Sequence, residues 1–137
     1  MNNVAPYKTV LTHGFVVDEQ GRKQSKSLGN VVSPQKVWDN LGADILRLWV
    51  ASTDFRSEMV ASDEILKQTS DQYRRIRNTF RFILGNTNDF SNKDKINFED
   101  QVELDKWIIN EGYKLQEQVV NVYNCYGYHK AVQAIHN

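Results

Sequence analysis

Residues 21–30, with the sequence GRKQSKSLGN, hold three cationic side chains, two hydroxyls and two glycines. Glycine allows the backbone to come close to a ligand. Hydroxyls and successive backbone N–H groups can donate hydrogen bonds to phosphate oxygens, and lysine adds a mobile positive charge on a long side chain. These residue types at this spacing indicate a loop that handles a phosphate group.

A solvated surface loop is the competing interpretation, because polar connecting segments generally run over protein surfaces. The segment is not a P-loop, since the pattern G-x-x-x-x-G-K-[ST] does not occur in the chain. The residue types alone therefore leave a phosphate site and a solvated loop both open.

The elements beside this segment follow from local patterns. Residues 7–17 are rich in β-branched and aromatic side chains and predict a strand. Residues 18–30 are polar and without periodicity, and they predict an exposed loop. Ser33 as N-cap and Pro34 at the first helical position predict the start of a short helix, and Gly42 predicts its end.

The remaining chain predicts further helices, because its apolar residues recur at steps of three and four. We expect a short helix at about 43–52, a connector at 53–61, a long helix at about 63–85 capped by Ser62, a loop at 86–101, a second long helix at about 103–124 and a third from about 128. The expected fold class is mainly α, with one short strand. A strand without a partner strand in the sequence, and a last helix without a stop signal, favour a segment of a larger protein over a small α+β domain.

Composition restricts the classes of protein. The 137 residues are 40% hydrophobic and can form a core. The single cysteine, Cys125, excludes an internal disulfide partner and a cysteine-rich zinc site, and suits the reducing cytosol. No apolar run approaches the roughly 20 residues of a membrane span, and the N-terminus has no signal or transit pattern. We therefore expect a cytoplasmic protein without a membrane partner.

A second group of cations lies on the first long helix. Arg74, Arg77 and Arg81 stand at i, i+3 and i+7 and form one basic stripe. The net charge of the chain is zero, but residues 1–86 carry +3 and residues 87–137 carry −3. A basic stripe suits an RNA backbone, and a solvated helix face is the alternative.

Histidine and tryptophan give weaker signals. His13 is interpreted as a structural histidine bonded to the backbone, with a contact near the phosphate site as the alternative. His129 and His136 lack partners at ligand spacing, so no metal site is expected. The three tryptophans are expected in the core rather than as platforms for stacked bases; they are Trp38, Trp49 and Trp107.

Longer motifs surround the lysine-rich segment. K-Q-S-K-S is preceded by L-T-H-G-F and continues into S-L-G-N; further on come S-P-x-x-V-x-x-x-L-G-A-D-I-L-R-L-W-V-A-S, Y-R-R-I-R-N-T and V-E-L-D-K-W. Together these motifs resemble the class I aminoacyl-tRNA synthetases, whose KMSKS motif is matched except at Gln24, over nearly the whole chain. L-W-V-A-S-T-D and Y-R-R-I-R-N-T favour the isoleucyl branch, with the valyl and leucyl branches as siblings.

The resemblance implies an organisation. Residues 1–33 would end a Rossmann-type catalytic domain, residues 34–62 would form stem-contact helices, and residues 63–137 would begin a helical anticodon-binding domain. It also implies a parent ligase that uses ATP and Mg²⁺ to activate isoleucine and then transfers it to tRNA(Ile). The segment alone is expected to be inactive and to bind no cofactor.

The resemblance also implies residue roles. Lys26 matches the second lysine of the motif, expected to grip the ATP phosphates in the transition state, and Lys23 matches the first, expected to assist. Ser25 and Ser27 complete the implied ATP-binding set, because their hydroxyls can donate hydrogen bonds. The arginine stripe on the first long helix becomes a candidate tRNA contact.

Two departures from the family pattern limit this interpretation. Gln24 replaces an apolar methionine and needs a hydrogen-bond partner if buried. The second family motif, H-I-G-H, does not occur in the chain. A free-standing helical tRNA-binding module and a helical scaffold domain with a fortuitous lysine loop therefore remain alternatives.

Overall fold

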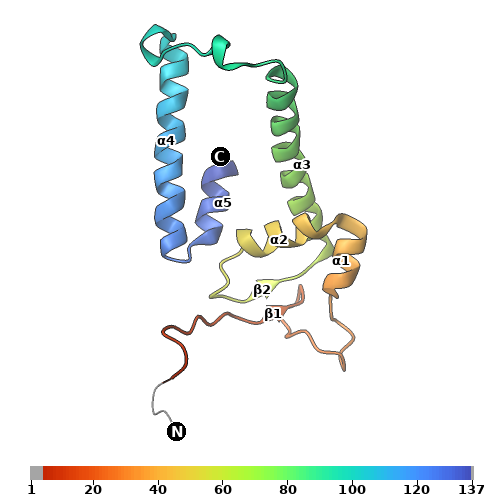
Figure 1. Cartoon of the computed structure of the whole chain (residues 1–137). Helices are drawn as coiled ribbons and strands as arrows, with labels where there is room; N and C mark the ends of the chain where they lie inside the picture. Colours follow the sequence, from red (N-terminus) through yellow and green to blue (C-terminus); the bar gives the residue numbers. More distant parts are fainter. Residues whose placement is uncertain (1–4, 137) are drawn as a thin grey trace.

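The computed structural model describes residues 5–136, and within them helices dominate (Figure 1). The elements in chain order are β1 (Val16–Val17), α1 (Pro34–Leu41), α2 (Ala43–Ser52), β2 (Met59–Val60), α3 (Asp63–Asn86), the 3-10 turns η1 (Asn92–Asp94) and η2 (Phe98–Asp100), α4 (Glu103–Asn124) and α5 (Tyr128–His136). The expected mainly helical class is confirmed, and each predicted helix begins where the structure has it. None of the described helices is long and apolar enough to cross a membrane.

The predicted strand over 7–17 is wrong for most of its length. Only its last two residues form β1, which pairs in parallel with β2, Val16 opposite Met59 and Val17 opposite Val60. The partner strand β2 lies in the segment predicted as a connector. A strand persists only where a neighbour satisfies its backbone hydrogen bonds, and β2 offers just two residues for this.

The core lies where α1, α2, β2 and the first turns of α3 meet. Its buried side chains are Val37, Trp49, Met59, Ala61 and Leu66. Each helix contributes the apolar side of its period-3.6 pattern, as expected for amphipathic helices. This small cluster supports the strand pair from which the lysine-rich loop departs.

Only one of the three tryptophans lies in the core as expected. Trp49 is a core residue and is 8% exposed, as predicted. Trp38 and Trp107 are 43% and 56% exposed, so the core prediction is wrong for both. Trp38 lies on α1 and Trp107 on α4, on helix faces that no described element covers fully.

The two long helices stand apart beyond the core. Figure 1 shows α3 and α4 as two columns joined at their far ends by the segment with η1 and η2. The last helix, α5, turns back beside α4 and packs against both α4 and α2. Phe82 on α3 and Leu104 on α4 are 70% and 69% exposed. The apolar stripe of α3 is therefore buried only near the core, where Leu66 lies, and no residue of α4 is buried within the described chain. No described element packs along the outer halves of the two helices.

The segment between α2 and β2 touches both the strand side and the helical side of the molecule. On the strand side, the backbone N–H of Gly14 donates to the carbonyl of Phe55 over 2.7 Å. On the helical side, the Phe55 and Tyr128 rings lie with centroids 6.2 Å apart. His129 Nε2 lies 4.0 Å from a carboxylate oxygen of Asp54. This junction links β1 with the start of α5.

The N-caps of α3 and α1 allow a matched stability test. The Ser62 hydroxyl accepts from the backbone N–H of Ile65 over 3.2 Å, whereas Ser33 makes no side-chain cap hydrogen bond. Ser62→Ala is expected to lower the free energy of unfolding by about 1 kcal/mol. Ser33→Ala should change it by less than about 0.5 kcal/mol. Urea unfolding followed by circular dichroism measures both, and equal losses would contradict the assignment of the cap.

Candidate phosphate-binding loop

The lysine-rich segment leaves β1 through a tight turn. Asp18 donates its backbone N–H to the carbonyl of Arg22 over 2.9 Å, and Gly21 donates back to the carbonyl of Asp18 over 2.9 Å. Gly21 has a φ of +73°, a left-handed conformation that favours glycine. An isolated antiparallel bridge between Val17 and Lys23 then holds the returning chain beside β1. The first half of the predicted loop is thus anchored to the strand.

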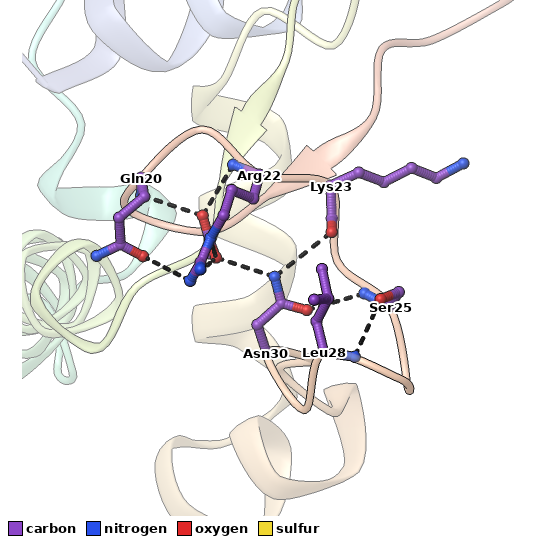
Figure 2. A network of polar contacts seen from close by, with 7 residues as sticks. Gln20, Arg22, Lys23, Ser25, Leu28 and Asn30 are labelled. Carbon is purple, nitrogen blue, oxygen red and sulfur yellow. Dashed lines mark hydrogen bonds and ion pairs between the residues drawn. The ribbon is translucent and has the colours of Figure 1, made fainter.

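The carboxylate of Asp18 accepts hydrogen bonds from several residues of the loop (Figure 2). Its Oδ1 accepts from the backbone N–H groups of Gln20 (3.1 Å) and Arg22 (2.8 Å). Its Oδ2 accepts from Arg22 Nε (2.8 Å) and from Asn30 Nδ2 (2.9 Å). The Asn30 hydrogen bond, followed by those from Arg22, holds the pKa of Asp18 well below its ordinary value. Asp18 is therefore a buried, permanently charged acceptor at neutral pH.

Asn30, near the end of the loop, is hydrogen-bonded to residues at the beginning of the loop and at its tip. Its Nδ2 reaches the carbonyl of Lys23 over 3.4 Å as well as Asp18, and its Oδ1 accepts from the backbone N–H of Ser25 over 2.9 Å. Within the tip, the Ser25 hydroxyl accepts from the backbone N–H of Leu28 over 3.3 Å. Figure 2 shows these contacts running from Asn30 to Lys23 and Ser25.

The structure brings some of the predicted ligands together and separates others. The hydroxyls of Ser25 and Ser27 lie 3.2 Å apart. Lys23 instead extends away from Ser25 in Figure 2, with its Nζ 4.1 Å from the centroid of the Phe15 ring. Lys26 is exposed in the turn at the tip and forms no ion pair within residues 5–136. The loop tip therefore presents two adjacent hydroxyls and the exposed Lys26, while the exposed Lys23 lies beside Phe15.

Gln24 meets only part of its hydrogen-bonding requirement. Its Oε1 accepts from the backbone N–H of Val32 over 3.2 Å, which attaches the loop to the chain leading into α1. Its Nε2 is buried and has no hydrogen-bond partner in the described chain. The amide thus replaces the packing of an apolar side chain with one backbone hydrogen bond and one unsatisfied donor.

Sequence reasoning missed Asp18 and Asn30. A signal for the first was present, because an aspartate shortly before a glycine is typical of an Asx turn. Nothing in the local pattern predicts that Asn30, twelve residues further on, donates to the same carboxylate. That contact depends on the return of the chain along β1.

Beside the strand lies a different kind of cavity. It has a volume of about 740 Å³ and is lined mainly by apolar side chains of the strand segment and α2, including Leu11, Trp49 and Val50. His13 lies on its wall, and its Nδ1 is 2.7 Å from the carbonyl oxygen of Gly14, the expected backbone hydrogen bond. An apolar lining suits an apolar group, so the loop is the better candidate for a phosphate.

The arginine stripe lies on an exposed face of α3. Arg74, Arg77 and Arg81 are all exposed on α3. Arg74 forms an ion pair with Asp71 over 3.1 Å, and neither of the other two pairs with a carboxylate in the described part of the chain. The stripe is available to a large anionic partner.

A divalent cation does not fit the residues of this loop. Among residues 5–136, no group of three or more His, Cys, Asp and Glu side chains is arranged to hold a metal ion. The carboxylate that is hydrogen-bonded to this loop, Asp18, already accepts hydrogen bonds at both oxygens. The loop itself is suited to phosphate oxygens rather than to Mg²⁺.

Comparison with known proteins identifies the class. Residues 1–62 match the family of class I tRNA synthetases (I, L, M and V). The fold agrees: the structure superposes on a crystal structure of the Agrobacterium radiobacter K84 LeuRS–tRNA–LeuAMS ternary complex with a TM-score of 0.79 and 27% identity, covering 90% of this chain and 16% of that chain. The chain belongs to the class I tRNA synthetases.

Within that class, the chain is homologous to isoleucine–tRNA ligases over its whole length. It is 55% identical over 137 residues to the ligase of Vesicomyosocius okutanii, covering 100% of this chain and 14% of the relative. It is 56% identical over 134 residues to the ligase of Chromohalobacter salexigens, and 57% identical over 136 residues to that of Edwardsiella ictaluri. These matches cover 97% and 98% of this chain. The chain therefore spans only about 14% of the length of these relatives.

Proposed function

We propose that this chain is the part of an ATP-dependent isoleucine–tRNA ligase that supplies the phosphate-binding lysine loop and part of the tRNA-binding helical region. The observation that carries the proposal is the K-Q-S-K-S loop anchored between β1 and α1, in a chain 55% identical to such ligases over its full length. The whole protein would activate isoleucine with ATP, transfer it to tRNA(Ile) and work in the cytoplasm.

The proposed chemistry needs positive charge rather than a nucleophile from this loop. The carboxylate of isoleucine would attack the α-phosphorus of ATP, and negative charge would grow on the departing pyrophosphate. Such reactions depend on positioning and on electrostatic stabilisation. The exposed ammonium of Lys26 and the paired hydroxyls of Ser25 and Ser27 would meet those phosphate oxygens. Lys23 would assist after leaving the Phe15 ring.

Mg²⁺ would enter this reaction with the nucleotide. The ion would neutralise phosphate charge, and its ligands would come from ATP and from outside this loop, because both oxygens of Asp18 are occupied. The residues of this loop would then contribute cations and hydrogen-bond donors only.

The proposed division of the chain keeps three parts: residues 1–33 as the end of the catalytic domain, residues 34–62 as the stem-contact region, and residues 63–137 as the start of the anticodon-binding domain. The pairing of β1 with β2 supports a close link between the first two parts, because it joins a strand of each. The exposed arginine stripe on α3 supports an RNA contact in the third.

Amino-acid-dependent ATP–pyrophosphate exchange by the full-length protein tests the proposed function. Exchange should be strongest with isoleucine among isoleucine, valine, leucine and methionine. Strongest exchange with valine or leucine would keep the assignment to the class I synthetases and would place the protein in the valyl or leucyl branch instead. Absence of exchange with every amino acid would overturn the proposal and favour a tRNA-binding module or a scaffold.

The arginine stripe makes a separate prediction. The double variant Arg74→Glu/Arg77→Glu is expected to weaken tRNA binding by the full-length protein roughly tenfold. The slope of log affinity against log salt should become shallower by about 1.4 to 1.8, because two phosphate contacts are lost. Filter binding over a salt series measures both quantities. Lys114→Glu on α4 is the matched control, since Lys114 is also exposed and paired with an acidic residue three positions away. An equal effect in the control would contradict a specific role for the stripe.

A further inference from the structure

We propose that Asp18 and Asn30 are positioning residues that fix the conformation of the K-Q-S-K-S loop and thereby place Lys26 on the ATP phosphates. The inference rests on the proposed function for its catalytic consequence. Its structural part, that this pair closes the loop, stands on the contacts of the two side chains.

The first support is the burial of a charge where no substrate could use it. Asp18 is 8% exposed and accepts hydrogen bonds from two backbone N–H groups, one guanidinium and one amide. A carboxylate with both oxygens engaged has no capacity left for a ligand. Burying it is costly unless every partner is in place. Its contribution must therefore be to the shape of the loop.

The second support is the reach of Asn30. This amide contacts Asp18 at the start of the loop, the carbonyl of Lys23 in the segment that leads to the tip, and the N–H of Ser25 at the tip. It is thus the side chain through which the carboxylate is connected to the residues that carry the proposed ligands. The remaining hydrogen bonds of the tip are local, such as that from the Gly29 N–H to the Lys26 carbonyl over 3.3 Å. Loss of the Asp18–Asn30 contact would leave the tip linked to the strand side through the backbone of Lys23 and Gln24 alone, where the Gln24 N–H donates to the Val16 carbonyl over 3.2 Å.

The third support is the position of Lys26 relative to this link. The Lys26 side chain makes no hydrogen bond or ion pair within residues 5–136, so its placement depends on the backbone of the tip. The backbone of its neighbour Ser25 is held by Asn30. A lysine acting in the transition state is sensitive to displacements of about 1 Å. Misplacement should therefore lower kcat more than it raises KM for isoleucine.

The test changes the charges at positions 18 and 30 of the full-length protein. Asn30→Asp sets two carboxylates at the distance of the present hydrogen bond, where they repel each other. It is expected to lower kcat of ATP–pyrophosphate exchange roughly five- to tenfold, with the KM for isoleucine nearly unchanged. Asp18→Asn/Asn30→Asp restores an amide opposite a carboxylate and should recover at least about threefold of the loss. Such recovery is the coupling expected of directly interacting residues.

A matched control lies just outside the loop. Gln35 on α1 donates from its amide to Asp39 over 3.1 Å, so Gln35→Glu creates the same kind of repulsion on an exposed helix face. This variant should keep the exchange rate of the wild type. Hydrogen–deuterium exchange gives a second readout: peptides covering 19–31 should exchange faster in Asn30→Asp, while peptides from α3 should not change.

The outcomes separate this inference from the function on which it rests. A wild type active with isoleucine, together with an Asn30→Asp variant of equal kcat or unchanged loop exchange, would overturn the inference alone. Equal activity of the single and double variants would also overturn it. A wild type inactive with every amino acid would overturn the proposed function, whatever the loop exchange shows.

Discussion

Lys26→Ala is expected to lower ATP–pyrophosphate exchange by the full-length protein about 10- to 200-fold. The exposed ammonium of Lys26 would bind the phosphate oxygens most strongly as pyrophosphate departs. One charge-assisted hydrogen bond contributes roughly 1.5–3 kcal/mol, which corresponds to this range of rates. Because the interaction would form mainly in the transition state, kcat should fall while the KM for isoleucine changes little.

Lys36→Ala provides the control for this experiment. Lys36 is an exposed lysine on α1, ten residues beyond Lys26, and its removal changes the net charge equally. Its exchange rate should stay close to that of the wild type. If both variants lose activity to the same extent, the effect is one of overall charge. If neither loses activity, the assignment of Lys26 is wrong.

Gly14→Ala is expected to lower the free energy of unfolding by about 1–3 kcal/mol, the usual cost of overpacking. A Cβ at this position would overlap the backbone carbonyl of Ser57. Backbone atoms cannot move aside as easily as the end of a flexible side chain. The backbone N–H of Gly14 also donates to Phe55 over 2.7 Å, so the two segments are held close together. Urea unfolding of the chain measures the loss.

Gly112→Ala serves as the opposite case. Gly112 lies inside α4 with open space at the position of a Cβ. Alanine there should stabilise the chain by about 0.5–1 kcal/mol, because it favours the helix. An unfolding midpoint for Gly14→Ala equal to that of the wild type would show that the two segments separate more easily than the structure indicates.

The helices were predictable because their signals are local. Pro34 and Ser62 mark two helix starts, and the spacing of the apolar residues fixes the lengths of α3 and α4. These signals require nothing from the rest of the chain. The burial of the apolar stripes was not predictable, since Phe82 and Leu104 carry the right periodicity and still lie exposed.

The strand and the loop depend on distant partners, so the sequence predicted them only in part. A β-rich segment predicts strand tendency, but the two residues of β1 are selected by Met59 and Val60, more than forty positions away. In the loop, the resemblance indicated Lys23, Lys26 and Ser27, which are exposed, and Ser25, which is half-buried. It did not indicate the buried Asp18 beneath them, because that role arises only when the chain returns along β1.

The junction between α2 and β2 has a mechanical consequence. One short stretch of backbone holds the strand that leads into the lysine loop, through the Gly14–Phe55 hydrogen bond, and also bears the first turn of α5, through Tyr128 and His129. A rotation of α5 against α2 would therefore strain this stretch. The stretch is joined to the chain leading into β1 by the Gly14–Phe55 hydrogen bond, and where it continues into β2 by the hydrogen bonds from Met59 to Phe15 and from Ala61 to Val17. The same few residues therefore help to hold both the start of α5 and the strand before the loop, so softening the junction would loosen both.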